Sequence, residues 1–125
     1  MAARTLKTAG ITGVGMSFPE KRLTNADLEK MVDTNDEWIV ERTGIKERRI
    51  LKEEGKGTSY LAIKAAEDLL RKRNLDPAEI DLVLVGTATP DMPVASTAVY
   101  VAAEIGAVNA FAYDMQAACS NFLYG

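Results

Sequence analysis

The sequence predicts an α/β fold, with a mixed, largely parallel sheet and helices on its faces. Apolar positions at helical spacing alternate with short strand-like runs along the second half of the chain. The run at 82–85 is continuously apolar, which is typical of a strand buried on both faces of a parallel sheet. The 125 residues are 47% hydrophobic and 26% charged, as in an ordinary globular domain, and the net charge of −3 argues against a polybasic nucleic-acid module.

The small, apolar stretch at 9–17 predicts a first strand that lies close to other backbone. Its glycines, Gly10, Gly13 and Gly15, do not have the G-x-G-x-x-G order, and no helix signal follows them. A dinucleotide loop is therefore the weaker alternative.

Two short helices should follow this stretch. Thr24 can cap the first, with Asp27 in its first turn, and its apolar face consists of Leu28, Met31 and Val32. Thr34 and Glu37 form a capping box for the second helix, which Gly44 ends.

The remaining chain continues the alternation of helices and strands. The expected elements are an exposed extended segment at 45–52, a helix at 59–73, a helical turn opened by Asp76 and Pro77, a strand at 82–85, a helix at 95–105 ended by Gly106, and a strand at 108–115. Ligands collect at the carboxyl ends of strands in such sheets, so the loops at 87–93 and 114–119 are the candidate sites.

Cys119 is the only cysteine, and the chain contains no histidine. A single cysteine excludes an internal disulfide and a CxxC metal site, and it fits a cytoplasmic protein. No stretch is long and apolar enough to span a bilayer, and we find no signal peptide, so we expect neither a membrane nor a nucleic-acid partner.

Cys119 is expected where a strand ends and a helix begins. Free N–H groups at a helix N-terminus stabilise a thiolate and can hold an oxyanion, so a nucleophile fits this position. When only its position in the chain is considered, Cys119 is more often a small buried hydrophobic side chain than a nucleophile.

Trp38 and Arg42 lie four residues apart on the second predicted helix. An indole and a guanidinium presented together could stack a purine and bind phosphate, although a packed tryptophan with an incidental arginine is more common. Arg42 also belongs to a basic cluster. Because glutamates are interleaved with the basic residues, this cluster is expected to be a solvated surface rather than a phosphate site; its members are Arg42, Lys46, Arg48, Arg49 and Lys52.

Longer motifs resemble the β-ketoacyl-acyl-carrier-protein synthase III family of the thiolase superfamily. They are PEKRLTNADLEKMV at 19–32, DTNDEWIVERTGIKERRI at 33–50, TATPDMPVAS at 87–96 and DMQAACSNFLYG at 114–125. The resemblance implies a thiolase-like fold of which residues 1–125 are the amino-terminal portion. It also implies an acyltransferase that condenses an acyl-CoA starter, such as acetyl-CoA, with malonyl-acyl carrier protein to initiate fatty-acid synthesis.

By this resemblance Cys119 is the nucleophile, which accepts the acyl group from CoA as a thioester. Trp38 matches the residue that stacks on the CoA adenine, Thr34 and Arg42 match its neighbours in nucleotide and phosphate binding, and Met92 matches a residue that lines the acyl pocket of the partner in a homodimer. CoA enters as substrate, and neither a cofactor nor a metal is implied.

Two departures from the family pattern stand out. Asn121 occupies a position where the family usually has glycine, and its bulk could crowd the entrance to the site. The family's catalytic histidine and asparagine belong to a later half that nothing here matches. A related CoA-dependent condensing enzyme of secondary metabolism, and a catalytically incompetent fragment, therefore remain alternatives.

Overall fold

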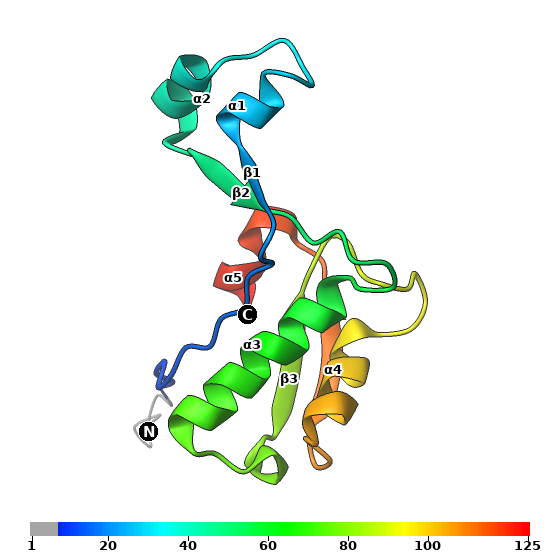
Figure 1. The fold of residues 1–125 in the computed structure, drawn as a ribbon. Coiled ribbons are helices and arrows are strands. Elements are labelled where there is room, and N and C mark those ends of the chain that lie inside the picture. The colour runs from blue at the N-terminus through cyan, green and yellow to red at the C-terminus, as the bar shows by residue number, and fades with distance from the viewer. Residues whose placement is uncertain (1–7) are drawn as a thin grey trace.

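The computed structural model describes residues 8–125, which form a larger α/β part and a smaller lobe (Figure 1). The smaller lobe contains β1 (Arg22–Thr24), α1 (Asn25–Leu28), α2 (Asp36–Thr43) and β2 (Glu47–Arg49). The larger part contains α3 (Thr58–Arg73), η1 (Pro77–Glu79), β3 (Leu82–Gly86), α4 (Thr97–Ile105), β4 (Phe111–Met115), η2 (Ala118–Ser120) and α5 (Asn121–Tyr124). Across residues 8–125, no helix has the length and apolar character needed to cross a membrane.

The two strands of the larger part, β3 and β4, pair in parallel, with Leu82 opposite Phe111 and Gly86 opposite Met115. Helix α4 packs on these strands, and α3 packs on α4 (Figure 1). The buried apolar side chains of this part come from α4 and the turn after it: Ala98, Val101, Ala102 and Ala107. The predicted parallel α/β arrangement is confirmed.

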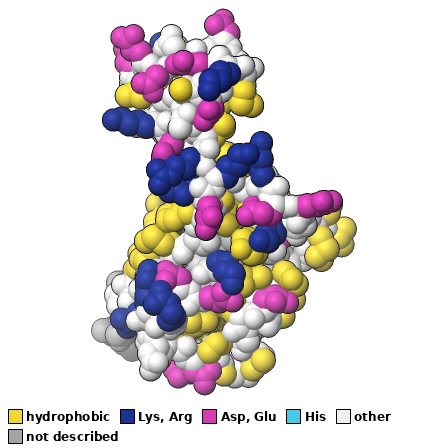
Figure 2. Space-filling model, in the orientation of Figure 1, with side chains coloured by type: hydrophobic (Ala, Val, Ile, Leu, Met, Phe, Trp, Pro, Cys, Tyr) yellow, Lys and Arg dark blue, Asp and Glu magenta, His cyan; other side chains and the backbone are white. Residues whose placement is uncertain are grey.

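One face of the β3–β4 sheet is largely uncovered in the described structure. Leu82 and its partner Phe111 are 48% and 69% exposed. Hydrophobic side chains reach the surface in several places over the larger part (Figure 2). The prediction that 82–85 is buried on both faces is therefore wrong for residues 8–125, because α4 packs on one face, whereas α5 and Gly125 reach the other face only near Leu84 and Gly86.

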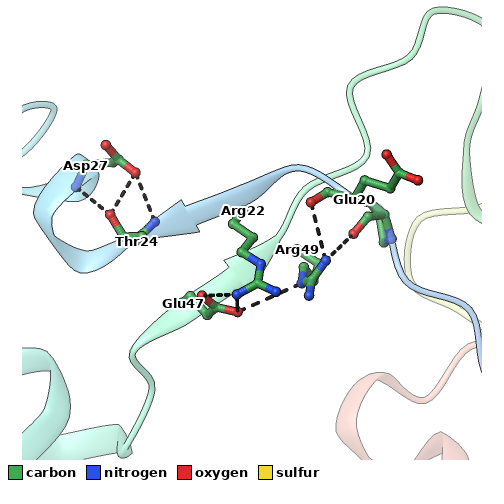
Figure 3. A network of polar contacts seen from close by, with 7 residues as sticks. Glu20, Arg22, Thr24, Asp27, Glu47 and Arg49 are labelled. Atoms are coloured by element: carbon green, nitrogen blue, oxygen red, sulfur yellow. Dashed lines mark hydrogen bonds and ion pairs between the residues drawn. The ribbon is translucent and has the colours of Figure 1, made fainter.

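The smaller lobe is built on an antiparallel pair, β1 and β2, with Thr24 opposite Glu47. Glu47 pairs with Arg22 at 3.2 Å, and the Arg49 guanidinium donates to the backbone carbonyl of Pro19 at 3.1 Å (Figure 3). Arg48 donates to the Asn25 carboxamide on α1. The segment at 45–52 is thus extended as predicted, and two arginines of its basic cluster hold this lobe together.

Helix α1 begins as the sequence predicts. Thr24 and Asp27 form a reciprocal capping box, and the hydroxyl of Thr24 donates to the Asp27 carboxylate at 2.7 Å (Figure 3). These hydrogen bonds from Thr24 hold the pKa of Asp27 below its usual value. The helix ends at Leu28, however, so Met31 and Val32 do not extend its apolar face and are exposed, contrary to the prediction.

Helix α2 begins one residue later than predicted. Asn35, not Thr34, is its N-cap, and the Asn35 side chain accepts from the backbone N–H of Trp38 at 2.8 Å. Both residue types can cap a helix, so composition alone does not choose between adjacent candidates. Gly44 ends the helix with φ 69°, as predicted.

The stretch at 9–17 has no regular secondary structure and pairs with no strand of the described residues, so the predicted first strand is wrong there. Its closeness to other backbone is nevertheless confirmed. A Cβ atom on Gly15 would lie 2.1 Å from the carbonyl oxygen of Ala65 on α3. The backbone N–H of Met16 donates to the Asp68 carboxylate on the same helix at 3.1 Å.

Other predicted boundaries differ slightly from the structure, and β3 extends one residue further than predicted, to Gly86. Helix α3 starts at Thr58, and α4 starts at Thr97 because the Ser96 side chain accepts from the backbone N–H of Val99. Strand β4 starts at Phe111, since the residues after Gly106 form a turn.

Candidate active site

Cys119 lies in the one-turn 3₁₀ helix η2 that connects β4 to α5, and its side chain is exposed. The predicted strand-to-helix junction is confirmed, with the 3₁₀ turn inserted ahead of the helix. The backbone N–H of Ser120 donates to the carbonyl of Ala117 at 2.9 Å and closes this turn around the thiol. Cys119 is thus presented at the apex of a tight turn.

The backbone of this turn is strained. Ala118, immediately before the thiol, has φ 45°, in the left-handed region that disfavours residues with a Cβ atom. Such strain costs about 1–2 kcal/mol and persists only where surrounding contacts impose it. One such contact is the hydrogen bond from the Ala117 N–H to the Asn121 carboxamide oxygen, at 2.6 Å.

Cys119 borders an open hollow of about 820 Å³ beside the carboxyl ends of β3 and β4. Its lining is mostly apolar and includes Ile11, Leu84, Met115, Phe122 and Leu123. Gly86 at the end of β3 and Asn121 on α5 complete the rim near the thiol. An acyl chain attached to the thiol would therefore meet apolar side chains.

Asp114 anchors the strand that leads to the thiol. Its two carboxylate oxygens accept the backbone N–H groups of Thr97 and Ala98, each at 2.7 Å. A carboxylate at a helix N-terminus satisfies otherwise unpaired donors and interacts favourably with the helix dipole. The end of β4 and the start of α4 are thereby held together.

Met92 lies in the loop between β3 and α4 and is 49% exposed. Two contacts tie this loop to the start of α3. The Thr58 hydroxyl donates to the Thr89 carbonyl at 2.7 Å, and the backbone N–H of Ser59 donates to the Asp91 carboxylate at 3.0 Å. The α3 N-cap, Gly57, has no side chain, so Asp91 acts as the cap from a distant loop.

Trp38 and Arg42 are presented together on α2, as the spacing predicts. The Arg42 guanidinium carbon lies 4.5 Å from the centroid of the Trp38 indole, a cation–π geometry, and the indole is 52% exposed. Thr34 is half-buried in the turn just before this helix. This pair can offer an aromatic surface and a positive charge to one ligand.

The structure brings the two predicted loops together but leaves the α2 pair apart from them. The backbone N–H of Thr87 donates to the carbonyl of Met115, so the loop with Met92 and the loop with Cys119 start side by side. Trp38 and Arg42 belong to the smaller lobe (Figure 1).

Sequence reasoning missed the caps that Asp91 and Asp114 provide. An acidic residue at the end of a strand or loop predicts such a cap only weakly. The N–H group that Asp91 caps lies 32 positions away along the chain, and one of those that Asp114 caps lies 17 positions away. Among residues 8–125, no three His, Cys, Asp or Glu side chains converge on a common point that could hold a metal ion.

This chain is similar to known condensing enzymes in both sequence and fold. It is 58% identical over 117 residues to the β-ketoacyl-[acyl-carrier-protein] synthase III of Azobacteroides pseudotrichonymphae, a match that covers 93% of this chain and 35% of that protein. The crystal structure of 3-oxoacyl-[acyl-carrier-protein] synthase III from Aquifex aeolicus aligns with a TM-score of 0.84 and 51% identity, over 90% of this chain and 36% of that one. No family model matches the chain.

A priming β-ketosynthase from the R1128 polyketide biosynthetic pathway also aligns, with a TM-score of 0.83 and 38% identity, over 90% of this chain and 33% of that one. These similarities confirm the α/β, thiolase-like fold expected from the sequence. The chain spans about a third of the length of the relatives that it matches.

Proposed function

We propose that this chain, homologous to β-ketoacyl-[acyl-carrier-protein] synthase III over 93% of its length, carries the acyl-accepting cysteine of such an acyltransferase. The observation that carries the proposal is the place of Cys119: an exposed thiol at the apex of a strained turn, beside an apolar hollow at the carboxyl ends of two parallel strands. A nucleophile and a space for an acyl chain are adjacent there.

In the first half-reaction, the Cys119 thiolate attacks the thioester carbonyl of an acyl-CoA, for which acetyl-CoA is the proposed starter. A bond forms between Sγ and the carbonyl carbon, the bond to the CoA sulfur breaks, and the thiol proton ends on CoA. In the second, malonyl-acyl carrier protein loses carbon dioxide, and the resulting carbanion attacks the acyl-cysteine and releases the thiolate. The product is a β-ketoacyl carrier protein, the first condensation product of fatty-acid synthesis.

Trp38 and Arg42 are the proposed contacts for the CoA nucleotide, with Thr34 beside them. The half-exposed indole offers a stacking surface, and Arg42 brings a positive charge within 4.5 Å of it. Met92 is proposed to line the acyl pocket of a second copy in a homodimer, since its loop is anchored at Ser59 while its own side chain remains half exposed.

Residues 1–125 are proposed to be the amino-terminal portion of the enzyme, in the cytoplasm. The relatives are about three times as long, and the open face with Leu82 and Phe111 offers an apolar surface for further chain to cover. Because this chain contains no histidine, the base that takes the thiol proton would come from that further chain.

The test is the intact mass of the protein from its whole reading frame after incubation with acetyl-CoA. We expect a single acyl adduct that maps to Cys119 and is absent in Cys119→Ser. Addition of malonyl-acyl carrier protein should discharge the adduct as a β-ketoacyl product. An equal adduct on the serine variant would overturn the proposal.

A second candidate is a condensing enzyme of secondary metabolism, favoured by the similarity to the R1128 priming β-ketosynthase. The same acyl-cysteine would form, but the acceptor would differ. Failure of malonyl-acyl carrier protein to discharge the adduct, together with discharge by another malonyl thioester, would favour this candidate.

A further inference from the structure

Asn121 is locked between the turn that carries Cys119 and the end of β3. Its carboxamide oxygen accepts the backbone N–H of Ala117 at 2.6 Å, and its backbone carbonyl accepts the N–H of Gly125 at 2.9 Å. The Asn121 side chain therefore links the start of α5 to Ala117, the residue just before the strained Ala118.

Gly86 makes room for this side chain. A Cβ atom on Gly86 would lie 2.8 Å from the Asn121 Cβ and 3.1 Å from its Cγ. A contact of 2.8 Å is closer than real Cβ atoms approach other atoms, so Asn121 is seated directly on the β3 backbone. A side chain at position 86 would overlap Asn121, so one of the two residues would have to move.

The strained residue lies inside the ring that Asn121 closes. Ala118 is held at φ 45° between Ala117, whose N–H and carbonyl are both bonded, and Ser120, which donates to that carbonyl. Without the carboxamide oxygen, the Ala117 N–H loses its partner and one restraint on the strained backbone disappears. The direction of the adjacent thiol depends on that backbone.

We infer that Asn121 is a positioning residue for acyl transfer: its carboxamide, seated on Gly86, fixes the turn that aims the Cys119 thiol into the apolar hollow. This inference rests on the proposed function of Cys119. It predicts that loss of the carboxamide oxygen slows attack by the thiol but leaves the binding of acyl-CoA unchanged.

The first test compares Asn121→Leu, which keeps the branched shape but removes the acceptor, with Asn121→Asp, which keeps an acceptor oxygen. The protein from the whole reading frame is used, each variant at the pH of its own maximal rate. We expect Asn121→Leu to lower the acylation rate at saturating acetyl-CoA about tenfold, as for one lost hydrogen bond, with the same KM. Asn121→Asp should retain a rate well above that of Asn121→Leu. Equal rates in Asn121→Leu and wild type, or equal losses in both variants, would overturn the inference.

Alkylation of the thiol by iodoacetamide separates this inference from the proposed function. If wild type forms no acyl adduct with any acyl-CoA, the proposed function fails. A slower alkylation of Asn121→Leu than of Asn121→Asp would still support the positioning of Cys119, and identical alkylation rates would contradict it.

A pair of glycine variants provides the test if Asn121→Leu does not fold. Gly86→Ala should slow alkylation of Cys119 in the wild-type background, because the new Cβ overlaps Asn121. In an Asn121→Gly background, Gly86→Ala should have little further effect. The same loss in both backgrounds would show that Gly86 and Asn121 do not act together, against the inference.

Discussion

The carboxylate of Asp91 lies 3.0 Å from the backbone nitrogen of Ser59, so the loop that carries Met92 caps a helix more than thirty residues earlier in the chain. Gly57 at the N-cap position has no side chain to do this, and a Cβ atom there would lie 2.3 Å from an Asp91 carboxylate oxygen. The missing side chain at one end of the contact makes room for the carboxylate at the other. Helix α3 and the Met92 loop are thus stabilised by the same hydrogen bond.

Asp91→Ala should lower the free energy of unfolding by about 1 kcal/mol, the usual cost of removing a helix cap. Asp91→Asn keeps an acceptor oxygen and should lose less. Urea denaturation of the two variants and wild type measures the difference. Identical midpoints for Asp91→Ala and wild type would show that the cap does not stabilise α3.

Gly15→Ala should lower the free energy of unfolding by about 2 kcal/mol, because the new methyl group overlaps the α3 backbone at Ala65. Gly10→Ala is the matched control, since nothing lies within 4 Å of a Cβ atom at that position. Thermal unfolding of both variants is the measurement. If the two glycines tolerate alanine equally well, the close packing of the 9–17 stretch on α3 is not present in solution.

Asp68→Asn should destabilise the protein at neutral pH and have a smaller effect in acid. Lys72, followed by the backbone N–H of Met16, holds the pKa of Asp68 at about 2, against an ordinary value of 3.8. A carboxyl whose pKa is lowered by folding stabilises the protein above its unfolded pKa, and this contribution is lost as the pH falls from about 4 towards 2. Urea midpoints of wild type and variant should therefore differ at pH 7 and converge near pH 2. A difference that stays constant across this range would contradict the linkage.

Trp38→Ala should raise the KM for acetyl-CoA about tenfold and leave the rate at saturation unchanged, because stacking of one base on an aromatic side chain contributes about 1–3 kcal/mol. Trp38→Phe keeps an aromatic face and should lose less. Since the indole is half exposed, neither change should unfold the protein. Steady-state kinetics provide the measurement, and a fall in the saturated rate without a change in KM would place Trp38 outside the nucleotide site.

Elements predicted from neighbouring residues agree best with the structure. Thr24 as the cap of the first helix, the helix ends at Gly44 and Gly106, and a parallel sheet with strands at 82–85 and 108–115 are expected from the sequence, and the structure shows all of them with β4 starting at Phe111. Each depends on contacts within one turn or on the periodicity of one segment. Asn35 rather than Thr34 is the N-cap of α2, and the sequence does not predict this choice. Asn and Thr are both good N-cap residues, and the exact first residue of a helix is the least predictable part of it.

Among the candidate site residues, the pairing of Trp38 with Arg42 follows from their spacing on one helix, and the structure confirms it. The place of Cys119 at a strand-to-helix junction also follows from the residues around it. The roles of these residues, together with those of Thr34 and Met92, came only from the resemblance to a family, since a lone cysteine or an exposed methionine has no chemical signature of its own. They remain predictions that the acylation and kinetic experiments address.

By itself, the sequence determined the local elements of this protein, their order and the position of its only thiol, because caps, glycine conformations and apolar periodicity act over a few residues. Only the tertiary structure decided that 9–17 lies on α3 without pairing to any strand of the described residues, that Asp91 and Asp114 cap helices from distant positions, and that Asn121 sits on Gly86. Each of these depends on a partner that lies many residues away. Hydrogen bonds and close contacts of that kind exist only once the chain has folded.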